Sequence, residues 1–196
     1  QNHGTEQNLG FGICAFAISQ GCGDPDLLAM VLDAGEPVDR YAPRVKGPGA
    51  PMIRAYDRAA RKRPIRKLDD VTLIYAYVSR STALHFAAYL GAMPAASLLL
   101  ERGAAVNSAA NPKAMTPLHL AAIGGHDDMC ARLLAAGAMV GLKDKRGRTA
   151  LWYAKTLGHE AVRERVVGCT ASKSRRRRRR HTRRPGSHTR RGTPGR

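Results

Sequence analysis

The sequence predicts an all-α fold in which helix–turn–helix repeats stack side by side into a solenoid with short hairpin loops. Three observations predict it. The segment TALHFAA at Thr82–Ala88 returns 34 residues later as TPLHLAA at Thr116–Ala122. It returns again, 33 residues further on, as TALWYAK at Thr149–Lys155. A second block, LLLERGAAVN, follows the first copy, and RLLAAGAMVG follows the second, again 34 residues apart. Self-similarity at a fixed period of this length indicates a repeat architecture.

The first block of each unit has the features of a helix start. Thr116 is suited to cap a helix by accepting a hydrogen bond from a free backbone N–H, and Pro117 fits the first helical position, where no N–H is needed. Leu118 and Ala121 share one face, and the small alanine allows a neighbouring helix to approach closely. Gly124-Gly125 then predicts the end of this first helix.

The second block predicts a second helix from about His126 to Ala136. Met129, Leu133 and Leu134 give this helix an apolar stripe. Gly137 supplies the left-handed backbone conformation that ends it. Two helices this short cannot bury their apolar faces alone, so the units must stack on one another to be stable.

These residues resemble the ankyrin repeat, whose pattern is a Thr-Pro-Leu-His helix start, a Gly-His turn, a leucine-rich second helix and a Gly-Ala-x-Val-Asn exit. The resemblance extends over residues 81–167 and includes the Asp-x-x-Gly-x-Thr hairpin at Asp144–Thr149. Trp152 and Tyr153 depart from the usual His-Leu, and one residue is inserted around Asn111-Pro112. The resemblance implies an ankyrin-type solenoid of four to five repeats that acts by binding other proteins.

The earlier chain carries a weaker form of the same pattern. The segment Leu27–Asp39 resembles a second helix with its exit, and its Gly35 precedes Gly103 by 68 residues, or two periods. This spacing leaves room for one divergent unit, with helices expected at Pro51–Ala60 and within Ile65–Ala76. The expected organisation is a flexible N-terminus at 1–9, an ankyrin repeat domain at 10–172 with units at 10–43, 44–80, 81–114, 115–147 and 148–170, and a tail at 173–196.

The last unit and the tail differ in composition from the other repeats. The second helix of unit 148–170 contains charged residues, as expected for a cap that no further repeat covers. The tail contains twelve lysines and arginines, no acid and no aliphatic residue. We therefore expect it to be disordered. The whole chain has a formal net charge of +18, of which the tail supplies twelve.

Composition also predicts the compartment. No stretch approaches the roughly 20 apolar residues that span a membrane. The four cysteines show no C-x-x-C spacing, which favours a reduced intracellular location, cytoplasmic or nuclear, over secretion. The chain begins with Gln1 in place of methionine, as a fragment of a longer protein would.

No pattern typical of catalysis is found. The sequence has no phosphate-binding glycine loop, nucleophile elbow or Cys/His nucleophile arrangement. His85, His119, His126 and His159 occupy repeat positions, so we expect them to bond to backbone and threonine groups and not to a metal. Asp127-Asp128 begins a helix, where carboxylates favour the helix dipole. The sequence therefore predicts no catalysis, cofactor, metal or small-molecule substrate.

The function predicted from these features is a non-catalytic scaffold for protein–protein interaction, which uses the concave face and the hairpin tips. An acidic partner segment with a few apolar side chains suits this surface, because apolar anchors supply most of the affinity and rim charges speed the encounter. Two sets of partner-binding residues are expected. Those that project from the hairpins are Lys113, Met115, Lys143, Lys145, Arg146 and Arg148. Those that line the groove on the concave side are Tyr89, Leu90, Ile123, Thr156 and Leu157.

An alternative makes nucleic acid or another polyanion the partner, bound through the arginine-rich tail and through Arg58–Lys67. Arginine runs neutralise phosphates without reading sequence, so such binding would be salt-sensitive and weakly specific. The tail also fits a nuclear-import signal read by an importin, or a solvated, repetitive end with no partner. The residues expected to carry either role are Lys173, Arg175, Arg176, Arg177, Arg178, Arg179, Arg180, Arg183 and Arg184.

Overall fold

The computed structural model describes residue 18 and residues 25–39, 81–109 and 111–169, and in this part of the chain loops join helices and no strand is present. Its helices are α3 (Pro25–Asp33), α6 (Ala83–Leu90), α7 (Met93–Glu101), α8 (Pro117–Gly124), α9 (Asp127–Ala135) and α10 (Ala150–Leu157). Residues 160–169 are also helical. The helices expected at Pro51–Ala60 and Ile65–Ala76, the N-terminus at 1–9 and the tail at 173–196 lie outside the described residues.

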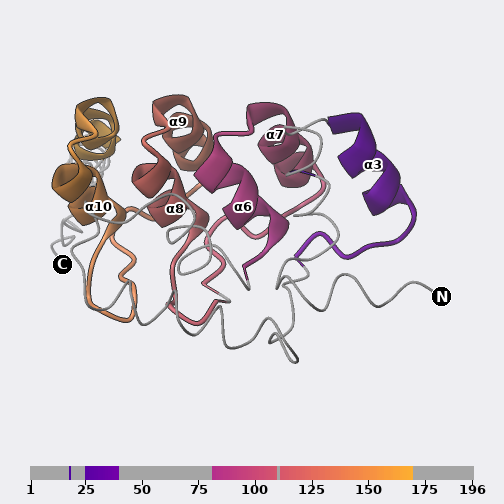
Figure 1. Ribbon diagram of the computed structural model, residues 1–196, viewed down its shortest axis with the longest axis horizontal. Coiled ribbons are helices and arrows are strands. Elements are labelled where there is room, and N and C mark those ends of the chain that lie inside the picture. Colours follow the sequence, from indigo (N-terminus) through magenta and orange to yellow (C-terminus); the bar gives the residue numbers. More distant parts are fainter. Residues whose placement is uncertain (1–17, 19–24, 40–80, 110, 170–196) are drawn as a thin grey trace, which may run out of the picture.

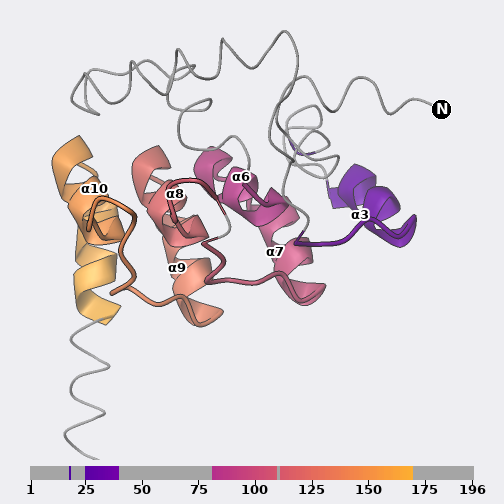
Figure 2. The ribbon, with the colours of Figure 1, turned by 90° about the horizontal axis from the view of Figure 1, so that it is seen from below.

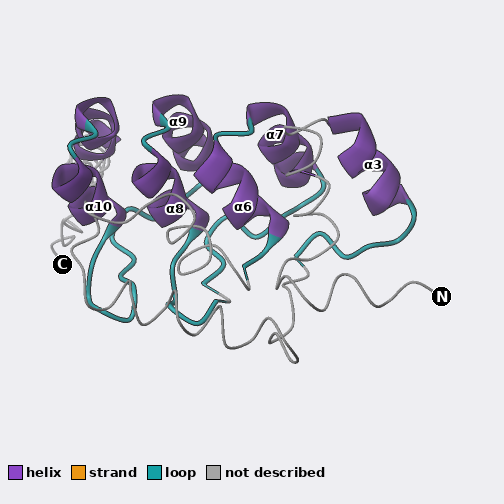
Figure 3. Ribbon diagram, in the orientation of Figure 1, coloured by secondary structure: helices purple, strands orange, loops and turns teal. Residues whose placement is uncertain are grey.

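The helices form two rows, as expected for a solenoid. The first helices α6, α8 and α10 stand side by side, and α7, α9 and residues 160–169 form the second row behind them (Figures 1 and 2). α8 packs between α6 and α10, and α7 contacts α9. The loops that join one unit to the next project together at one edge of the stack (Figure 3).

Each first helix begins directly after a threonine, as the sequence predicts. Thr82, Thr116 and Thr149 all have extended backbone angles at the N-cap position. The hydroxyl of Thr149 accepts a hydrogen bond from the backbone N–H of Trp152. The Thr82 hydroxyl lies instead 2.7 Å from the Nδ1 atom of His85.

The helix ends are also those predicted. Gly125 follows α8 in the left-handed conformation, with φ of 75°. Gly137 follows α9 with φ of 97°, and the backbone N–H of Ala138 donates back to the carbonyl of Leu133 at 2.9 Å. This bond satisfies one of the carbonyls that a helix end leaves without an intrahelical partner.

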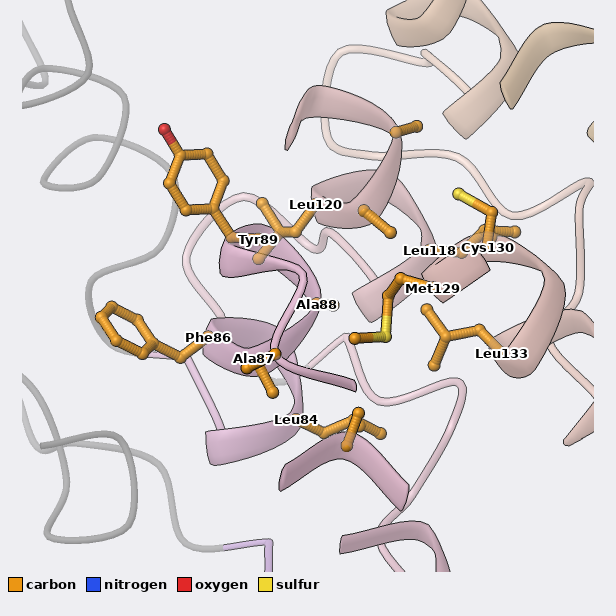
Figure 4. Packing of buried hydrophobic residues seen from close by; sticks show 14 of the residues in the cluster. Leu84, Phe86, Ala87, Ala88, Tyr89, Leu118, Leu120, Met129, Cys130 and Leu133 are labelled. Carbon is orange, nitrogen blue, oxygen red and sulfur yellow. The ribbon is translucent and has the colours of Figure 1, made fainter. Parts of the chain in front are cut away.

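The core runs along the stack and is not gathered at one centre. Leu118, Met129 and Leu133 are fully buried between the two rows (Figure 4). Phe86 and Tyr89 lie on the other side of α6 (Figure 4) and are buried as well. Every residue from Ala83 to Tyr89 is buried. The same is true from Pro117 to Ile123, so α6 and α8 are enclosed on nearly all sides.

The N-terminal helix α3 packs directly against α7. Asp33 accepts a hydrogen bond from Arg102 at 2.7 Å, and Asp39 accepts one from the backbone N–H of Ala105 at 3.0 Å. The next pair of units has the equivalent bond, in which Asn107 accepts from the backbone N–H of Met139 at 2.8 Å. The unit containing α3 is therefore the neighbour of unit 81–114. The divergent unit expected over residues 44–80 lies outside the described residues.

Candidate functional site

The last described hairpin, residues 143–149, is built around one buried carboxylate. The Asp144 side chain accepts hydrogen bonds from the backbone N–H groups of Arg146 and Arg148, both at 2.8 Å. It also accepts one from the Tyr153 hydroxyl at 2.6 Å. The backbone N–H of Asp144 donates to the carbonyl of Arg148 at 2.9 Å and closes the loop. The backbone of this hairpin is therefore held rigidly.

The hairpin is also tied to the unit before it. The backbone N–H of Lys145 donates to the carbonyl of Lys113 at 2.9 Å. In that earlier hairpin Asn111 takes the role of Asp144, since its side-chain oxygen accepts from the backbone N–H groups of Lys113 and Met115. Asn111 and Asp144 are 33 residues apart, whereas Asn107 and Gly141 are 34 apart. The inserted residue therefore precedes Asn111 and leaves the hairpin itself unchanged in length.

Ala114 stands where the last hairpin has Gly147, and it carries the same positive φ. The angle is 54° at Ala114 and 74° at Gly147. The left-handed region is strained for a residue with a Cβ atom but open to glycine. We expect Ala114→Gly to raise the free energy of unfolding by about 1 kcal/mol, measured by urea unfolding followed by circular dichroism.

The control for this substitution is Ala131→Gly, within helix α9. There the same change should lower the free energy of unfolding by about 1 kcal/mol, because glycine disfavours a helix interior. A loss of stability on Ala114→Gly would show that the positive φ at Ala114 carries no strain.

Arg148 and Trp152 form a stacked pair beside this hairpin. The guanidinium carbon of Arg148 lies 4.1 Å from the centroid of the Trp152 ring, within the range of a cation–π interaction. The Trp152 ring meets that of Tyr153 edge-on, with centroids 5.1 Å apart. Tyr153 in turn is fixed by its bond to Asp144. Contacts therefore connect the buried carboxylate to the Arg148 side chain.

His85 and His119 each bond to the backbone of the hairpin that follows their own unit. The sequence predicts backbone bonds of this kind for them. His85 Nε2 lies 2.9 Å from the carbonyl of Met115, and His119 Nε2 lies 3.2 Å from that of Arg148. Carbonyls only accept hydrogen bonds, so Nε2 carries the proton and Nδ1 accepts from the threonine hydroxyl. Burial lowers the pKa of His85 to about 4, against the raising effect of its bonds to backbone carbonyls. Burial also lowers the pKa of His119.

His126 and His159 make equivalent contacts at the other end of the first helices. His126 Nε2 lies 2.9 Å from the carbonyl of Tyr89, and His159 Nε2 lies 3.2 Å from that of Ile123. All four histidines therefore bind backbone groups, as expected. In the described part of the chain, no three His, Cys, Asp or Glu side chains come together as metal ligands. None of the helices described there has the length and apolarity that crossing a membrane requires.

The structure separates the predicted partner-binding residues into three groups: exposed, half-buried and buried. Lys143, Lys145 and Arg146 are exposed, and Leu90 is 39% exposed. The half-buried members are Lys113, Arg148, Thr156 and Leu157. Met115, expected to project from the stack, is fully buried. Tyr89 and Ile123, expected to line an open groove, are only 8% and 4% exposed.

The reason for these differences lies in the composition of the first helices. ALHFAAYL and PLHLAAIG contain no charged residue, and a helix that is apolar all round is buried all round. α10 differs, because its Trp152 is 38% exposed and its Lys155 is exposed. The accessible part of the first-helix row therefore lies at α10 and at Leu90, the last residue of α6. Sequence reasoning recorded Trp152 only as a departure from the repeat and missed it as a surface residue.

Charge on the described residues is balanced overall and uneven locally. Residues 25–39, 81–109 and 111–169 contain ten basic and ten acidic side chains. The helices of the second row, which we call the outer helices, carry paired charges. Arg165 binds Asp127 and lowers the pKa of that carboxyl, and Arg163 pairs with Glu160. Residues 143–148, in contrast, hold four cations and one acid, Asp144, which is buried and already hydrogen-bonded. The hairpin therefore carries a local excess of positive charge.

Comparison with known proteins identifies the repeat type. A family model for ankyrin repeats matches three copies, over residues 67–144 and 84–175. ARF GTPase-activating protein GIT1 of Homo sapiens is 36% identical over 108 residues, which are 55% of this chain and 14% of that protein. The probable E3 ubiquitin-protein ligase XBOS31 of Oryza sativa subsp. japonica is 39% identical over 93 residues, which are 47% of this chain and 21% of that protein. The chain thus spans about a fifth or less of the length of these relatives.

Proposed function

The chain belongs to the ankyrin repeat family, and on that basis we propose that it is a non-catalytic scaffold that binds a partner protein. Ankyrin repeats are protein-interaction modules. The enzymatic activities in the relatives' names belong to proteins of which this chain matches a small part. The observation that supports the proposal is the rigid cationic hairpin at residues 143–148, in a described part of the chain that has equal numbers of basic and acidic side chains overall.

The proposed partner carries an acidic segment. Lys143, Lys145 and Arg146 are exposed, and none of them forms an ion pair with another described residue. Because Asp144 holds the backbone of the hairpin, little backbone ordering is needed when these cations bind a partner. Thr156 and Leu157 are half-buried at the end of α10, where Leu157 supplies apolar surface. Tyr89, Ile123 and Met115 take no part, because they are buried.

The alternative partner is a polyanion bound through the tail, whose residues are outside the described part. The described repeats carry no net charge, so a polyanion has no general electrostatic attraction to them. We therefore assign protein binding to the repeats and keep polyanion binding or nuclear import as a separate property of residues 173–196.

The test is to capture partners with the full chain and to measure association kinetics of the captured protein. Lys145→Glu with Arg146→Glu should slow association by about tenfold, because rim charges act mainly on the encounter rate. The matched control reverses two charges on the outer helices, Arg132→Glu with Arg163→Glu, and should leave association unchanged. Circular dichroism checks that each variant keeps its helical content.

A third variant separates the tail from the repeats. Replacing residues 175–180 by glutamine in the full chain should leave the captured protein bound. If that variant releases the partner while the hairpin variant retains it with unchanged kinetics, the interaction belongs to the tail and the proposed function of the repeats is wrong.

A further inference from the structure

Trp152 occupies a repeat position at which the two preceding units have a histidine. His85 and His119 turn inward and donate to the carbonyl of the following hairpin. Trp152 makes no such bond to any described residue, is 38% exposed, and packs against Arg148. At this position the last unit therefore has an exposed aromatic ring beside the cationic hairpin, in place of a histidine that bonds to the next hairpin.

The surroundings of Arg148 fix its guanidinium in advance. Its backbone N–H donates to Asp144 and its carbonyl lies 3.2 Å from His119 Nε2. Its guanidinium stacks over the Trp152 ring. A stacked guanidinium still has the N–H groups at its edge available, and these match the two oxygens of a carboxylate. Arg148 makes no ion pair with any described residue.

We propose that Arg148 and Trp152, with Lys145 and Arg146, form a preorganised site that binds carboxylates of an acidic peptide segment. Arg148 binds one carboxylate through two N–H groups at the edge of its guanidinium. Lys145 and Arg146 bind the neighbouring carboxylates of the peptide. The Trp152 ring holds the guanidinium in position and supplies apolar contact to the peptide. This inference rests on the proposed function and assigns it a location and a chemistry.

The site suits carboxylates better than a nucleic-acid strand. Proteins that bind single strands offer open aromatic faces on which bases stack. Arg148 lies over the Trp152 ring, so a base would have to displace it. The cations here also lie within a single loop and do not form a stripe along a backbone. A peptide that brings two or three acidic side chains together fits this small cluster.

The single tryptophan of the chain lies in this site, so its fluorescence reports on the site alone. We expect octaglutamate to change Trp152 emission in a saturable way when added to the full chain. Octaglutamine of the same length should leave emission unchanged. Oligothymidylate of eight nucleotides provides the nucleic-acid comparison.

Arg148→Gln should weaken the octaglutamate response by about tenfold, since a charge-assisted bidentate hydrogen bond is lost. Arg148→Lys keeps the charge but loses the planar fork, so most of that weakening should remain. The control is Arg163→Gln on the outer helix, which should leave the response unchanged. Helical content by circular dichroism confirms that the variants are folded.

Three results would overturn the inference. The first is that octaglutamate does not alter Trp152 emission. The second is that Arg148→Gln responds to octaglutamate as the unaltered chain does. The third is that oligothymidylate binds at Trp152 more tightly than octaglutamate. If any of them occurs while a captured protein still depends on Lys145 and Arg146, the scaffold function stands and only this site is wrong. If the captured protein is indifferent to those residues as well, both proposals fail.

Discussion

Asp144→Ala is expected to lower the free energy of unfolding by about 3 kcal/mol, because it removes three hydrogen bonds to a buried charged acceptor. The backbone N–H groups of Arg146 and Arg148 lose their shared partner, and the Tyr153 hydroxyl loses the carboxylate. Because the carbonyl of Arg148 also serves His119, the loss should extend to the joint with the preceding unit. Urea unfolding followed by circular dichroism measures the change.

The chain supplies a matched control for this prediction. Asn111 makes the same two backbone bonds with an uncharged side chain, so Asp144→Asn should keep them and lose only about 1 kcal/mol. Asp128→Ala removes an exposed carboxylate from the start of α9 and should change stability by about 0.5 kcal/mol. If Asp144→Ala were as mild as Asp128→Ala, the hairpin would not depend on its carboxylate.

Acidification from pH 7 to pH 5 should destabilise the repeats by about 2 kcal/mol through His85 alone. Burial lowers the pKa of His85 from 6.5 to about 4 in the folded protein. Between these two values the unfolded chain binds a proton that the folded chain does not. Stability is therefore full above pH 6.5 and declines as the pH falls toward 4. His119, whose pKa is also lowered by burial, acts in the same direction.

Urea unfolding at the two pH values tests this prediction, with His85→Asn as its control. The variant is less stable at pH 7, because it loses the bonds to the carbonyls of Ser108 and Met115. Its further loss of stability between pH 7 and pH 5 should be about 2 kcal/mol smaller than that of the unaltered chain. An identical loss in both proteins would place the acid sensitivity elsewhere.

The repeat architecture was predictable because its signals are local. Thr116 and Pro117 precede a helix, Gly137 follows one, and Leu118 and Leu133 recur at the repeat period, so each position is defined by its near neighbours in the chain. The histidine contacts were predictable for the same reason. The contact between α3 and α7 was not predictable, because the number of residues between Gly35 and Gly103 does not show which units touch.

The candidate site was predicted only in part. Lys143, Lys145 and Arg146 are exposed as expected, because charged residues in a short hairpin remain solvated. Tyr89 and Ile123 were expected in an open groove, and the structure shows them buried. The sequence did contain a signal of this burial, because α6 and α8 have no charged residue. The stacking of Arg148 on Trp152 depends on side-chain orientation, which residue types and spacing alone do not reveal.

The absence of charge from α6 and α8 also bears on how the chain is made. Eight-residue apolar segments of this kind are prone to aggregate while they are exposed. α6 is covered by α8, whose helix starts 34 residues later, and a ribosome adding about 5 to 20 residues per second makes that length in about 2 to 7 seconds. Because α8 covers α6 and α10 covers α8, each of these two apolar segments is exposed on the nascent chain only until the next unit has been made.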